Sequence, residues 1–559
     1  MNHWIVAPVV LPLMTGALML LAGRHTLLVA RAALASTALL LAISIGLLIA
    51  ADGNRVEAYL LANWQAPFGI VLVLDRLSAM LVALTAALAL AALIYARGGD
   101  DQRGAHFHPL FQFQLMGVNG AFLTGDLFNL FVFFEVLLIS SYGLLLHGAT
   151  RERLRASLHY VGFNLVGASI FLIAVSLLYG LTGTLNMADM AERMATLPAD
   201  RARLVQSAAL LLLVVFFVKA ALLPLHFWLP ATYGAASAPA AALFAIMTKV
   251  GVYSVLRVTT LIFGAQGGAA AFVADPWLPA LALATIAVAA IGALASRHLR
   301  MQIGYLVIGS AGTMLLAFGL ARADTIAAGL FYLVNSTFAA AALFLVADRI
   351  AAGRGATDDL LTPAPFDMSR NRLGIVFFIC AVAIAGVPPL AGFLGKALLL
   401  QSAGPTAWGG WVVAIVLASS LLVMVALARS GSVLFWSPAA IESAAGGSRF
   451  LEVLPYGPAP TRRNHGFALA LLLAALVTCS AAAGPIASYA SDTAAQLVDR
   501  RAYLDAVLKT EPAPPARDVR REMRERRAAE KAEKAEKAQD RATSGAPSVD
   551  APRAREAKP

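Results

Sequence analysis

Four ionisable residues lie inside long apolar segments of the sequence. They are Glu135 in FVFFEVLLISSYGLLL (131–146), Lys219 in VVFFVKAALLPLHFWLP (214–230), Lys249 in APAAALFAIMTKVGVYSVLR (238–257) and Lys396 in GVPPLAGFLGKALLL (386–400). An unpaired charge at bilayer depth costs at least about 2.5–3.5 kcal/mol, so residues of this kind mark proton or ion pathways by default. The three lysines are the only lysines among the first 490 residues.

One acid and three bases predict a buried ion pair. A Glu135–Lys219 pair inside the membrane would keep both groups charged. Separating the two would leave the lysine without a counter-charge and would favour its neutral amine. A pair that moves therefore acts as a proton switch. The alternative is a static salt bridge that only fixes helix packing.

Prolines interrupt the apolar segments around two of these lysines. A proline lacks the backbone N–H and leaves a carbonyl free one turn earlier. Such breaks are tolerated at membrane depth inside protein or beside a wet cavity. The predicted helix breaks are at Pro224, Pro230, Pro388 and Pro389.

Polar residues near the lysines are candidates for a relay. His226 follows Lys219 by seven residues, which is the same face of a regular helix, so it could pass protons between Lys219 and one surface. An interior histidine that is simply hydrogen-bonded is an equal alternative. Residues that could hold water are Thr248, Ser140 and Ser141.

The elements that must position these residues are membrane helices. Of the 559 residues, 59% are hydrophobic and 13% are charged, which is about half the roughly 25% charged residues of a soluble domain. This composition excludes a soluble enzyme and a secreted disulfide scaffold. The net charge of +11 lies in loops and one tail, so it indicates no nucleic-acid partner. Because the only two cysteines lie in apolar runs and no metal-ligand spacing occurs, we expect no metal and no cofactor.

We expect an all-α polytopic membrane protein with about fourteen transmembrane helices. The seventh and twelfth are the broken ones, and each is fourth in a unit of five helices. This predicts two inverted repeats, formed by helices 4–8 and 9–13. The apolar runs lie near residues 4–22, 26–50, 76–96, 108–125, 127–147, 157–180, 204–228, 238–263, 275–295, 302–320, 325–348, 372–400, 408–432 and 466–489.

These helices divide the chain into five regions. With the N-terminus outside, seventeen loop arginines face the inside and six the outside, which predicts a periplasmic N-terminus. The expected regions are 1–107 (three helices with a strand-like external segment at 56–74), 108–263 (first repeat), 275–432 (second repeat), 433–508 (last helix and an amphipathic segment, 491–508, for the membrane surface or a partner) and 509–559 (a charged tail, either a solvated helix or disordered).

The chain resembles the antiporter-like membrane subunits of respiratory complex I and of multisubunit cation/proton antiporters over residues 1–508. The resemblance rests on KAALLPLHFWLP, the glutamate of the fifth helix, and the lysines of the seventh, eighth and broken twelfth helices. Within this group, ATYGAASAP (231–239) and the ending AQLVDRRAYLDAVL look like the D-type subunits of Mrp/Pha-type antiporters.

The resemblance implies a proton path and an assembly. Glu135 and Lys219 would be the proton-coupling pair, Lys249 the central relay, and Lys396 the link to the opposite surface or the next subunit. It also implies other antiporter subunits and membrane lipids as partners, protons and Na⁺ or K⁺ as transported ions, and a bacterial cytoplasmic membrane.

The predicted eleventh helix departs from the family pattern. Relatives often carry histidine there, whereas GLFYLVNSTFAAAALFLVADRI (329–350) has no ionisable group before Asp348. The path from Lys249 to Lys396 would then need water and polar groups. The candidates are Asn335, Ser336 and Thr337.

Three functions therefore compete. The first is a proton-translocating subunit of a cation/proton antiporter, a transporter rather than an enzyme. The second is a proton-pumping membrane subunit of a redox complex, such as a complex I-like NADH:quinone oxidoreductase or a membrane-bound hydrogenase. The third is a structural anchor, against which the three intramembrane lysines argue.

Overall fold

The computed structural model describes residues 2–23, 26–53, 55–364, 366, 370–436, 462–512, 526–533 and 535. Residues 1–510 form one compact unit and residues 511–559 a second. In the second unit, residues 526–533 are helical and exposed, as expected for a charged segment without an apolar stripe. Most of the remaining predicted tail lies outside the described residues.

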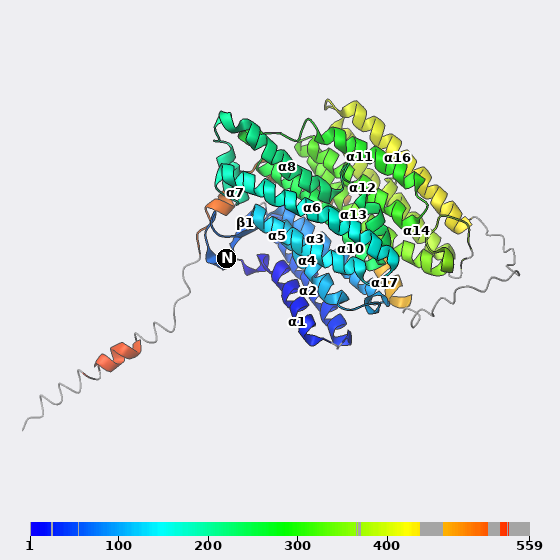
Figure 1. Ribbon diagram of the computed structural model, residues 1–559, viewed down its shortest axis with the longest axis horizontal. Coiled ribbons are helices and arrows are strands. Elements are labelled where there is room, and N and C mark those ends of the chain that lie inside the picture. The colour runs from blue at the N-terminus through cyan, green and yellow to red at the C-terminus, as the bar shows by residue number, and fades with distance from the viewer. Residues whose placement is uncertain are drawn as a thin grey trace, which may run out of the picture. The chain divides into compact units, whose positions relative to one another are not determined.

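The first unit is a bundle of helices with one small β-hairpin (Figure 1). Eleven of the described helices are long and apolar enough to cross a membrane, and α1 is a shorter apolar helix. The number of crossings and the inverted repeats stay predictions. The unbroken helices before the C-terminal segment are α1 (Ala7–Ala22), α2 (Thr26–Ala51), α3 (Arg76–Ala96), α4 (Phe107–Leu123), α5 (Leu127–Leu146), α6 (Arg151–Thr182), α7 (Met187–Met194), α10 (Ala238–Leu261), α11 (Leu278–Ala295), α12 (Leu299–Gly319), α13 (Ala323–Arg354) and α16 (Gly409–Gly431).

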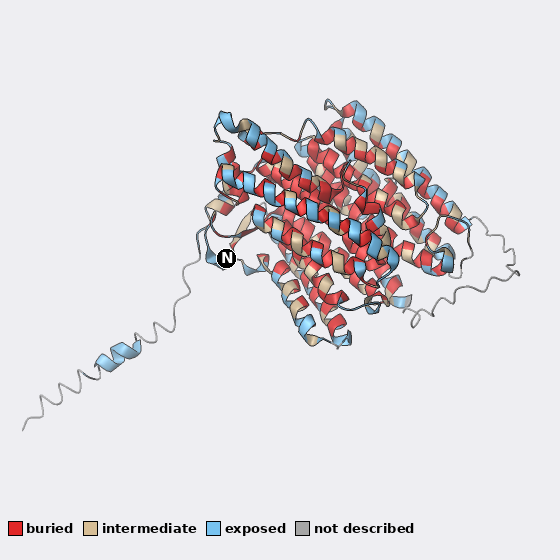
Figure 2. Ribbon diagram, in the orientation of Figure 1, coloured by how far each residue is buried: buried red, intermediate tan, exposed pale blue. Residues whose placement is uncertain are grey.

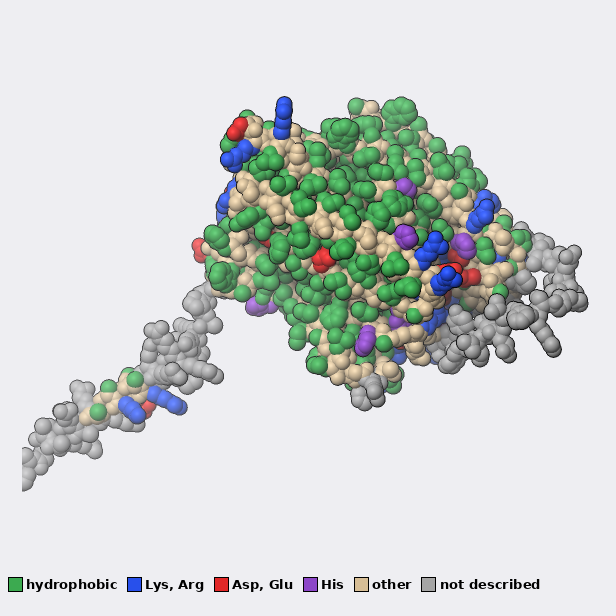
Figure 3. Space-filling view, in the orientation of Figure 1, with side chains coloured by type: hydrophobic (Ala, Val, Ile, Leu, Met, Phe, Trp, Pro, Cys, Tyr) green, Lys and Arg blue, Asp and Glu red, His purple; other side chains and the backbone are tan. Residues whose placement is uncertain are grey.

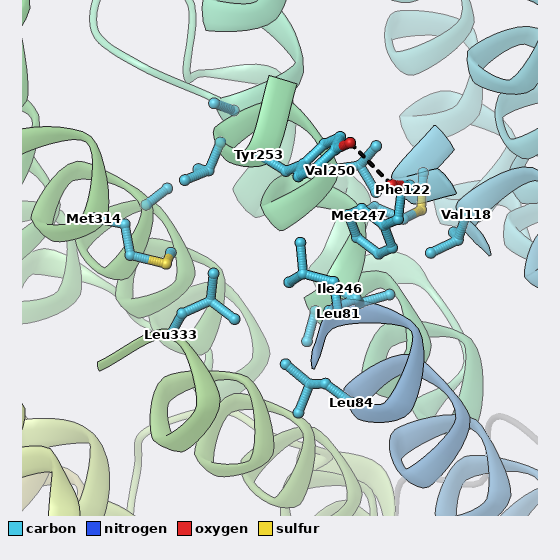
Figure 4. Packing of buried hydrophobic residues seen from close by; sticks show 14 of the residues in the cluster. Leu81, Leu84, Val118, Phe122, Ile246, Met247, Val250, Tyr253, Met314 and Leu333 are labelled. Carbon is cyan, nitrogen blue, oxygen red and sulfur yellow. Dashed lines mark hydrogen bonds between the residues drawn. The ribbon is translucent and has the colours of Figure 1, made fainter. Parts of the chain in front are cut away.

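The helices α10 and α13 form the interior of the bundle. Both are buried along nearly their whole length, whereas α6 has exposed residues along one side (Figure 2). Val250 of α10 belongs to the same buried cluster as Leu81 of α3 and Leu333 of α13 (Figure 4). The outer face in Figure 3 is mainly hydrophobic, and most of its charged side chains lie toward its ends. A membrane solvates such a surface without cost.

The chain leaves helical geometry in two places beside the lysines. One break lies between α8 (Ala202–Ala220) and α9 (Trp228–Ala235), where Ala221 adopts the left-handed conformation and Pro224 follows. The other separates α14 (Arg370–Ala385) from α15 (Ala391–Ala403) and contains Pro388 and Pro389.

Pro230 makes no break, contrary to the sequence prediction. It is the third residue of α9. In the first turn of a helix a proline removes only an N–H that has no partner within that helix. The interruption therefore ends before Pro230, and the turn after α8 is where the backbone changes direction.

Segment 56–74 forms an antiparallel hairpin, which confirms its strand-like pattern. Its strands are β1 (Glu57–Leu60) and β2 (Val71–Leu74), with Glu57 opposite Leu74. We call the end of the bundle that carries this hairpin the hairpin face. The C-terminal end of α10 lies there. Leu261 at that end bonds to Arg500, the residue before the helix α19 (Arg501–Leu508), and α19 packs on β1.

The C-terminal segment folds back onto its own chain. That 491–508 also lies on the membrane surface or against a partner stays a prediction. The last apolar helix ends earlier than predicted and two more helices follow it. Their apolar stripe covers α13, α10 and α7 of the same chain, and Tyr503 and Val507 are buried. These helices are α17 (Arg462–Ala481), α18 (Ala483–Val498) and α19 (Arg501–Leu508).

Candidate functional site

Lys219 is the next-to-last residue of α8 and points into the bundle rather than toward a counter-ion. Its side chain is buried, and Nζ donates a hydrogen bond to Oδ1 of Asn164 on α6 at 2.8 Å. Nζ also lies 5.8 Å from the centre of the Phe134 ring. The direct partner of this lysine is therefore a neutral amide, which the sequence analysis missed. A lone Asn in the apolar run of α6 was the signal that could have found it.

Glu135 lies close to Lys219 without forming an ion pair. The two charges interact, but among the described residues no basic group lies within 4.0 Å of the carboxylate. Glu135 is half-buried and shares a stripe of α5 with three exposed apolar residues. They are Phe128, Val132 and Ile139. The two members of the predicted switch therefore lie near each other but are not in ion-pair contact.

A close contact between helices holds Lys219 beside α10. A Cβ on Gly251 of α10 would lie 2.6 Å from the backbone N of Ala220 and 3.0 Å from the Cβ of Lys219. Only glycine allows α8 and α10 to approach this closely. Gly251 comes two residues after Lys249, so this contact joins the end of α8 to the part of α10 that carries Lys249.

Lys249 is completely buried at the centre of α10. Its Nζ donates to Oγ of Ser310 on α12 at 3.3 Å. Lys396 on α15 donates to the carbonyl oxygen of Ala385 at 2.7 Å and to Oγ of Ser420 on α16 at 2.9 Å. Ala385 is the last residue of α14, so this bond uses a carbonyl that the break leaves free.

A small cavity joins the surroundings of these two lysines. Its room for water is about 40 Å³, which is enough for roughly two to four molecules. It is lined by the hydroxyl partner of Lys249 and by Lys396 itself. The other polar lining residues are Thr313, Tyr332, Tyr305, Ser419 and Ser420.

The three polar residues predicted on α13 do not line this cavity. Asn335 donates from Nδ2 to the carbonyl oxygen of Ala383 at 3.1 Å and so ties α13 to the end of α14. The hydroxyls of Ser336 and Thr337 both bond to the carbonyl of Leu333 within their own helix. Tyr332 presents its side of α13 to the cavity instead, because side-chain direction follows from helix packing, which the sequence does not give.

The other predicted water-holding residues have hydrogen-bond partners of their own. Thr248 and Ser140 bond to carbonyls of their own helices. Ser141 shares a hydrogen bond of 3.0 Å with the hydroxyl of Tyr160 on α6. Tyr160 lies one turn before Asn164, whose Nδ2 donates to the Tyr160 carbonyl.

His226 lies in the break between α8 and α9, so the seven-residue helical spacing from Lys219 does not hold. Its Nδ1 is buried and has no hydrogen-bond partner among the described atoms. Trp228, two residues later, reaches the lysine region instead, because its Nε1 donates to the carbonyl of Val218 at 3.2 Å. Its ring stacks on Tyr160 at 5.2 Å.

A larger cavity meets this tryptophan at the end of α6 that lies away from α7. Its volume is about 550 Å³. Burial raises the pKa of Asp358 in its wall, so protonation there occurs at a pH above the usual carboxyl range. The titratable lining residues are Glu152, Arg155, His159, His298, Arg300, Asp358 and Asp359. Trp228 and Thr232 also line it, so a polar vestibule ends one ring away from the Lys219 backbone.

No cluster of three metal-ligating side chains occurs among the described residues. Cys380 and Cys479 are both free and buried. The site is thus made of amines, amides, hydroxyls and carboxylates, which is suited to proton transfer and water binding.

Comparisons with known proteins fit this arrangement. Residues 124–424 match the family described as NADH:quinone oxidoreductase/Mrp antiporter, membrane region. The chain belongs to this family. The match includes Glu135 and the three lysines.

Two relatives in the family match nearly the whole chain. The D-type subunit of the probable K⁺/H⁺ antiporter of Rhizobium meliloti is 40% identical, over 91% of this chain and 98% of its own length. The D-type subunit of the Na⁺/H⁺ antiporter of Alkalihalophilus pseudofirmus is 35% identical, over 91% of this chain and 100% of its own. Among solved structures, a chain of the Mrp complex from Dietzia sp. superposes with a TM-score of 0.79 at 26% identity, covering 91% of this chain and 100% of that one.

Proposed function

We propose that this chain is the proton-translocating subunit of a multisubunit Na⁺/H⁺ or K⁺/H⁺ antiporter in a bacterial cytoplasmic membrane. The observation that supports the proton path is the cavity between Lys396 and Ser310, whose hydroxyl bonds to Lys249. The choice of an antiporter over a redox-driven pump rests on the two antiporter relatives, which match over nearly their full length.

The path in this mechanism starts at the vestibule beside Trp228. The carboxylates and histidines of the vestibule collect protons, and the bonded hydroxyls of Tyr160 and Ser141 lie on the way to Lys219. The Tyr160 backbone carbonyl holds Asn164, the partner of Lys219. Glu135 is the mobile counter-charge of Lys219. With the carboxylate near, the ammonium is favoured. With it away, the amine is favoured and the proton moves on to Lys249.

From Lys249 the proton crosses the cavity to Lys396. Ser310 can both donate and accept, so it passes a proton from the lysine to cavity water. Ser420 receives the water chain beside Lys396 at the other end. This route replaces an ionisable group on α13 by water and hydroxyls from α12, α13 and α16.

The stripe of α5 that carries Glu135 faces a neighbouring subunit in this proposal. A half-buried carboxylate among Phe128, Val132 and Ile139 would be costly against lipid tails. A neighbouring subunit with a polar or basic residue at that depth would remove the cost. We propose further that the N-terminus and the hairpin face are periplasmic, as the loop arginines favour.

The decisive experiment is cation-triggered collapse of ΔpH in inverted vesicles. The whole gene cluster is expressed in a host without its own antiporters, and Lys219→Ala is measured beside the wild type after an assembly check. Lys509→Ala is the matched control, because Lys509 is exposed and bonds only to Asp505 among the described residues.

Collapse on adding Na⁺ or K⁺ that is lost in Lys219→Ala and kept in Lys509→Ala supports the proposal. Absence of any cation response in an assembled wild-type complex would contradict the antiporter and favour the redox-driven pump. A full response in an assembled Lys219→Ala complex would remove this chain from the proton path.

A further inference from the structure

A second buried polar cluster lies on α10, in the turns that follow Lys249 along the helix. Lys249, Tyr253 and Arg257 are spaced four residues apart, so they share one face of the helix. All three are at most 3% exposed. Eight residues separate Lys249 from Arg257, which is roughly 12 Å along the helix axis toward the hairpin face.

Arg257 is held by Asp75 and by Tyr253. Its Nη1 lies 2.6 Å from Oδ2 of Asp75, and its Nε donates to the hydroxyl of Tyr253 at 3.3 Å. That hydroxyl donates in turn to the carbonyl of Phe122 at 2.9 Å (Figure 4). Asp75 is the N-cap of α3, and its Oδ1 accepts from the backbone N–H of Ser78 at 2.8 Å.

The C-terminal helices cover this cluster. The guanidinium of Arg257 lies 5.1 Å from the centre of the Tyr503 ring of α19. Gln496 of α18 accepts from the backbone N of Arg76, next to Asp75, at 3.0 Å. Arg500 donates to the carbonyl of Leu261, the last residue of α10, at 3.0 Å.

The space left under this cover is very small. It holds about 10 Å³, which is at the lower limit for a single water molecule. Its ionisable lining includes two guanidinium groups, Arg257 and Arg500, and one carboxylate, Asp75. The charges leave one positive charge in excess beside a buried helix that carries Lys249.

The chemistry of these groups separates a relay from a block. A tyrosine hydroxyl both donates and accepts, so Tyr253 could receive a proton from the direction of Lys249. A guanidinium stays protonated, has no acceptor and repels a further positive charge. A proton that reached Tyr253 would therefore stop at Arg257.

We propose that Arg257, fixed by Asp75 and covered by α18 and α19, is a proton seal that prevents Lys249 from exchanging protons directly with the hairpin face. This inference rests on the proposed role of Lys249 as a proton carrier. A carrier that opened to both faces would dissipate the gradient instead of coupling it. The seal leaves the cavity toward Lys396 as the way out of Lys249.

The test replaces the seal by a group that can titrate. Arg257→His can still pair with Asp75, but it accepts and releases protons near neutral pH. Arg257→Lys keeps the charge and is the matched control. Inverted vesicles with the assembled complex are energised in a buffer without Na⁺ and K⁺. The decay of ΔpH is then followed after respiration is stopped.

We expect ΔpH to decay several times faster with Arg257→His than with the wild type, and at the wild-type rate with Arg257→Lys. Adding Lys249→Ala to Arg257→His should restore the slow decay, because the leak runs through that lysine. A packing defect would not be repaired by removing Lys249. Slow decay in Arg257→His, equal leaks in both Arg257 variants, or a leak that survives Lys249→Ala would each overturn the seal.

A second variant, Arg500→Gln, tests the same cavity. If Arg257→His does not assemble, Arg500→Gln removes the excess positive charge from the same cavity and should also speed the decay, whereas an unchanged decay counts against the seal. Because this readout needs no cation, it is independent of the antiport assay. If Na⁺ or K⁺ caused no collapse of ΔpH in the wild type, the antiporter proposal would be contradicted, but a faster leak in Arg257→His would still support the seal.

Discussion

Ser310 is the residue on which the predicted transfer from Lys249 to the cavity depends most directly. Its hydroxyl is the hydrogen-bond acceptor of the Lys249 Nζ at 3.3 Å and also lines the cavity that contains Lys396. Ser310→Ala removes the hydroxyl and leaves the packing nearly unchanged. The lysine then has no described partner through which to pass its proton.

The size of the effect follows from the bond that is lost. A hydrogen bond to a charged group contributes about 1.5–3 kcal/mol. The 3.3 Å distance is long, so the lower end applies. Since about 1.4 kcal/mol corresponds to a factor of ten, we expect roughly tenfold slower exchange.

The assay is the initial rate of cation-triggered ΔpH collapse in inverted vesicles that contain equal amounts of assembled complex. Ser254→Ala is the matched control, because Ser254 is a buried serine of α10 that bonds to the Val250 carbonyl of its own helix. Ser310→Thr, which keeps a hydroxyl, should recover most of the rate. A Ser310→Ala complex that works within a factor of two of the wild type would refute this route.

Three other predictions concern the surroundings of the lysines. Asn164→Leu removes the 2.8 Å bond to Lys219 and should lower the exchange rate at least about tenfold, as measured by the same assay; an unchanged rate would show that the amide does not take part. Gly251→Ala places a Cβ 2.6 Å from the backbone of α8 and should cost about 1–3 kcal/mol, seen as a lower melting temperature of the purified complex; Gly162→Ala, with open space around it, is the control and should melt like the wild type. Asp100 concerns pH: burial, followed by the charge of Asp348, raises the pKa of Asp100 to about 7. The folded protein then holds a proton that the unfolded chain releases, so the folded state becomes less stable as pH rises from about 4 to 7. Asp100→Asn should reduce the resulting fall in melting temperature between pH 5 and pH 8. An identical pH profile in the variant would contradict a buried Asp100 with a raised pKa.

In the proposed route from Lys249 to Lys396, a cavity lined by hydroxyls takes the place of an ionisable group on α13. Asn335 of α13 bonds to the carbonyl of Ala383 near the end of α14, beside the break. The cavity is instead lined by a turn of α12 and by Tyr332. A hydroxyl-lined water cavity transfers protons without a permanent charge, so it avoids the cost of burying one more ammonium.

The sequence by itself determined the class of protein and its ionisable residues. Apolar runs of membrane length define helices locally, because every backbone group in lipid must bond within its own segment. Four ionisable residues in such runs stand out because burying a charge at membrane depth is costly. The prolines at 224, 388 and 389 lie at the observed interruptions of the helices. The hairpin at 57–74 could also be predicted from neighbouring residues, since the alternation of apolar side chains and the turn are short-range signals.

The tertiary structure alone decided which of these residues meet. The Asn164 partner of Lys219, the Ser310 partner of Lys249 and the cavity that reaches Lys396 join helices far apart in the sequence. The helix break wrongly predicted at Pro230, the helical spacing of His226 from Lys219 that does not hold, and the packing of α18 and α19 on the chain have the same origin. The spacing of residues in one helix gives the face they share, but the neighbour of that face is set by packing between helices, which no single segment encodes.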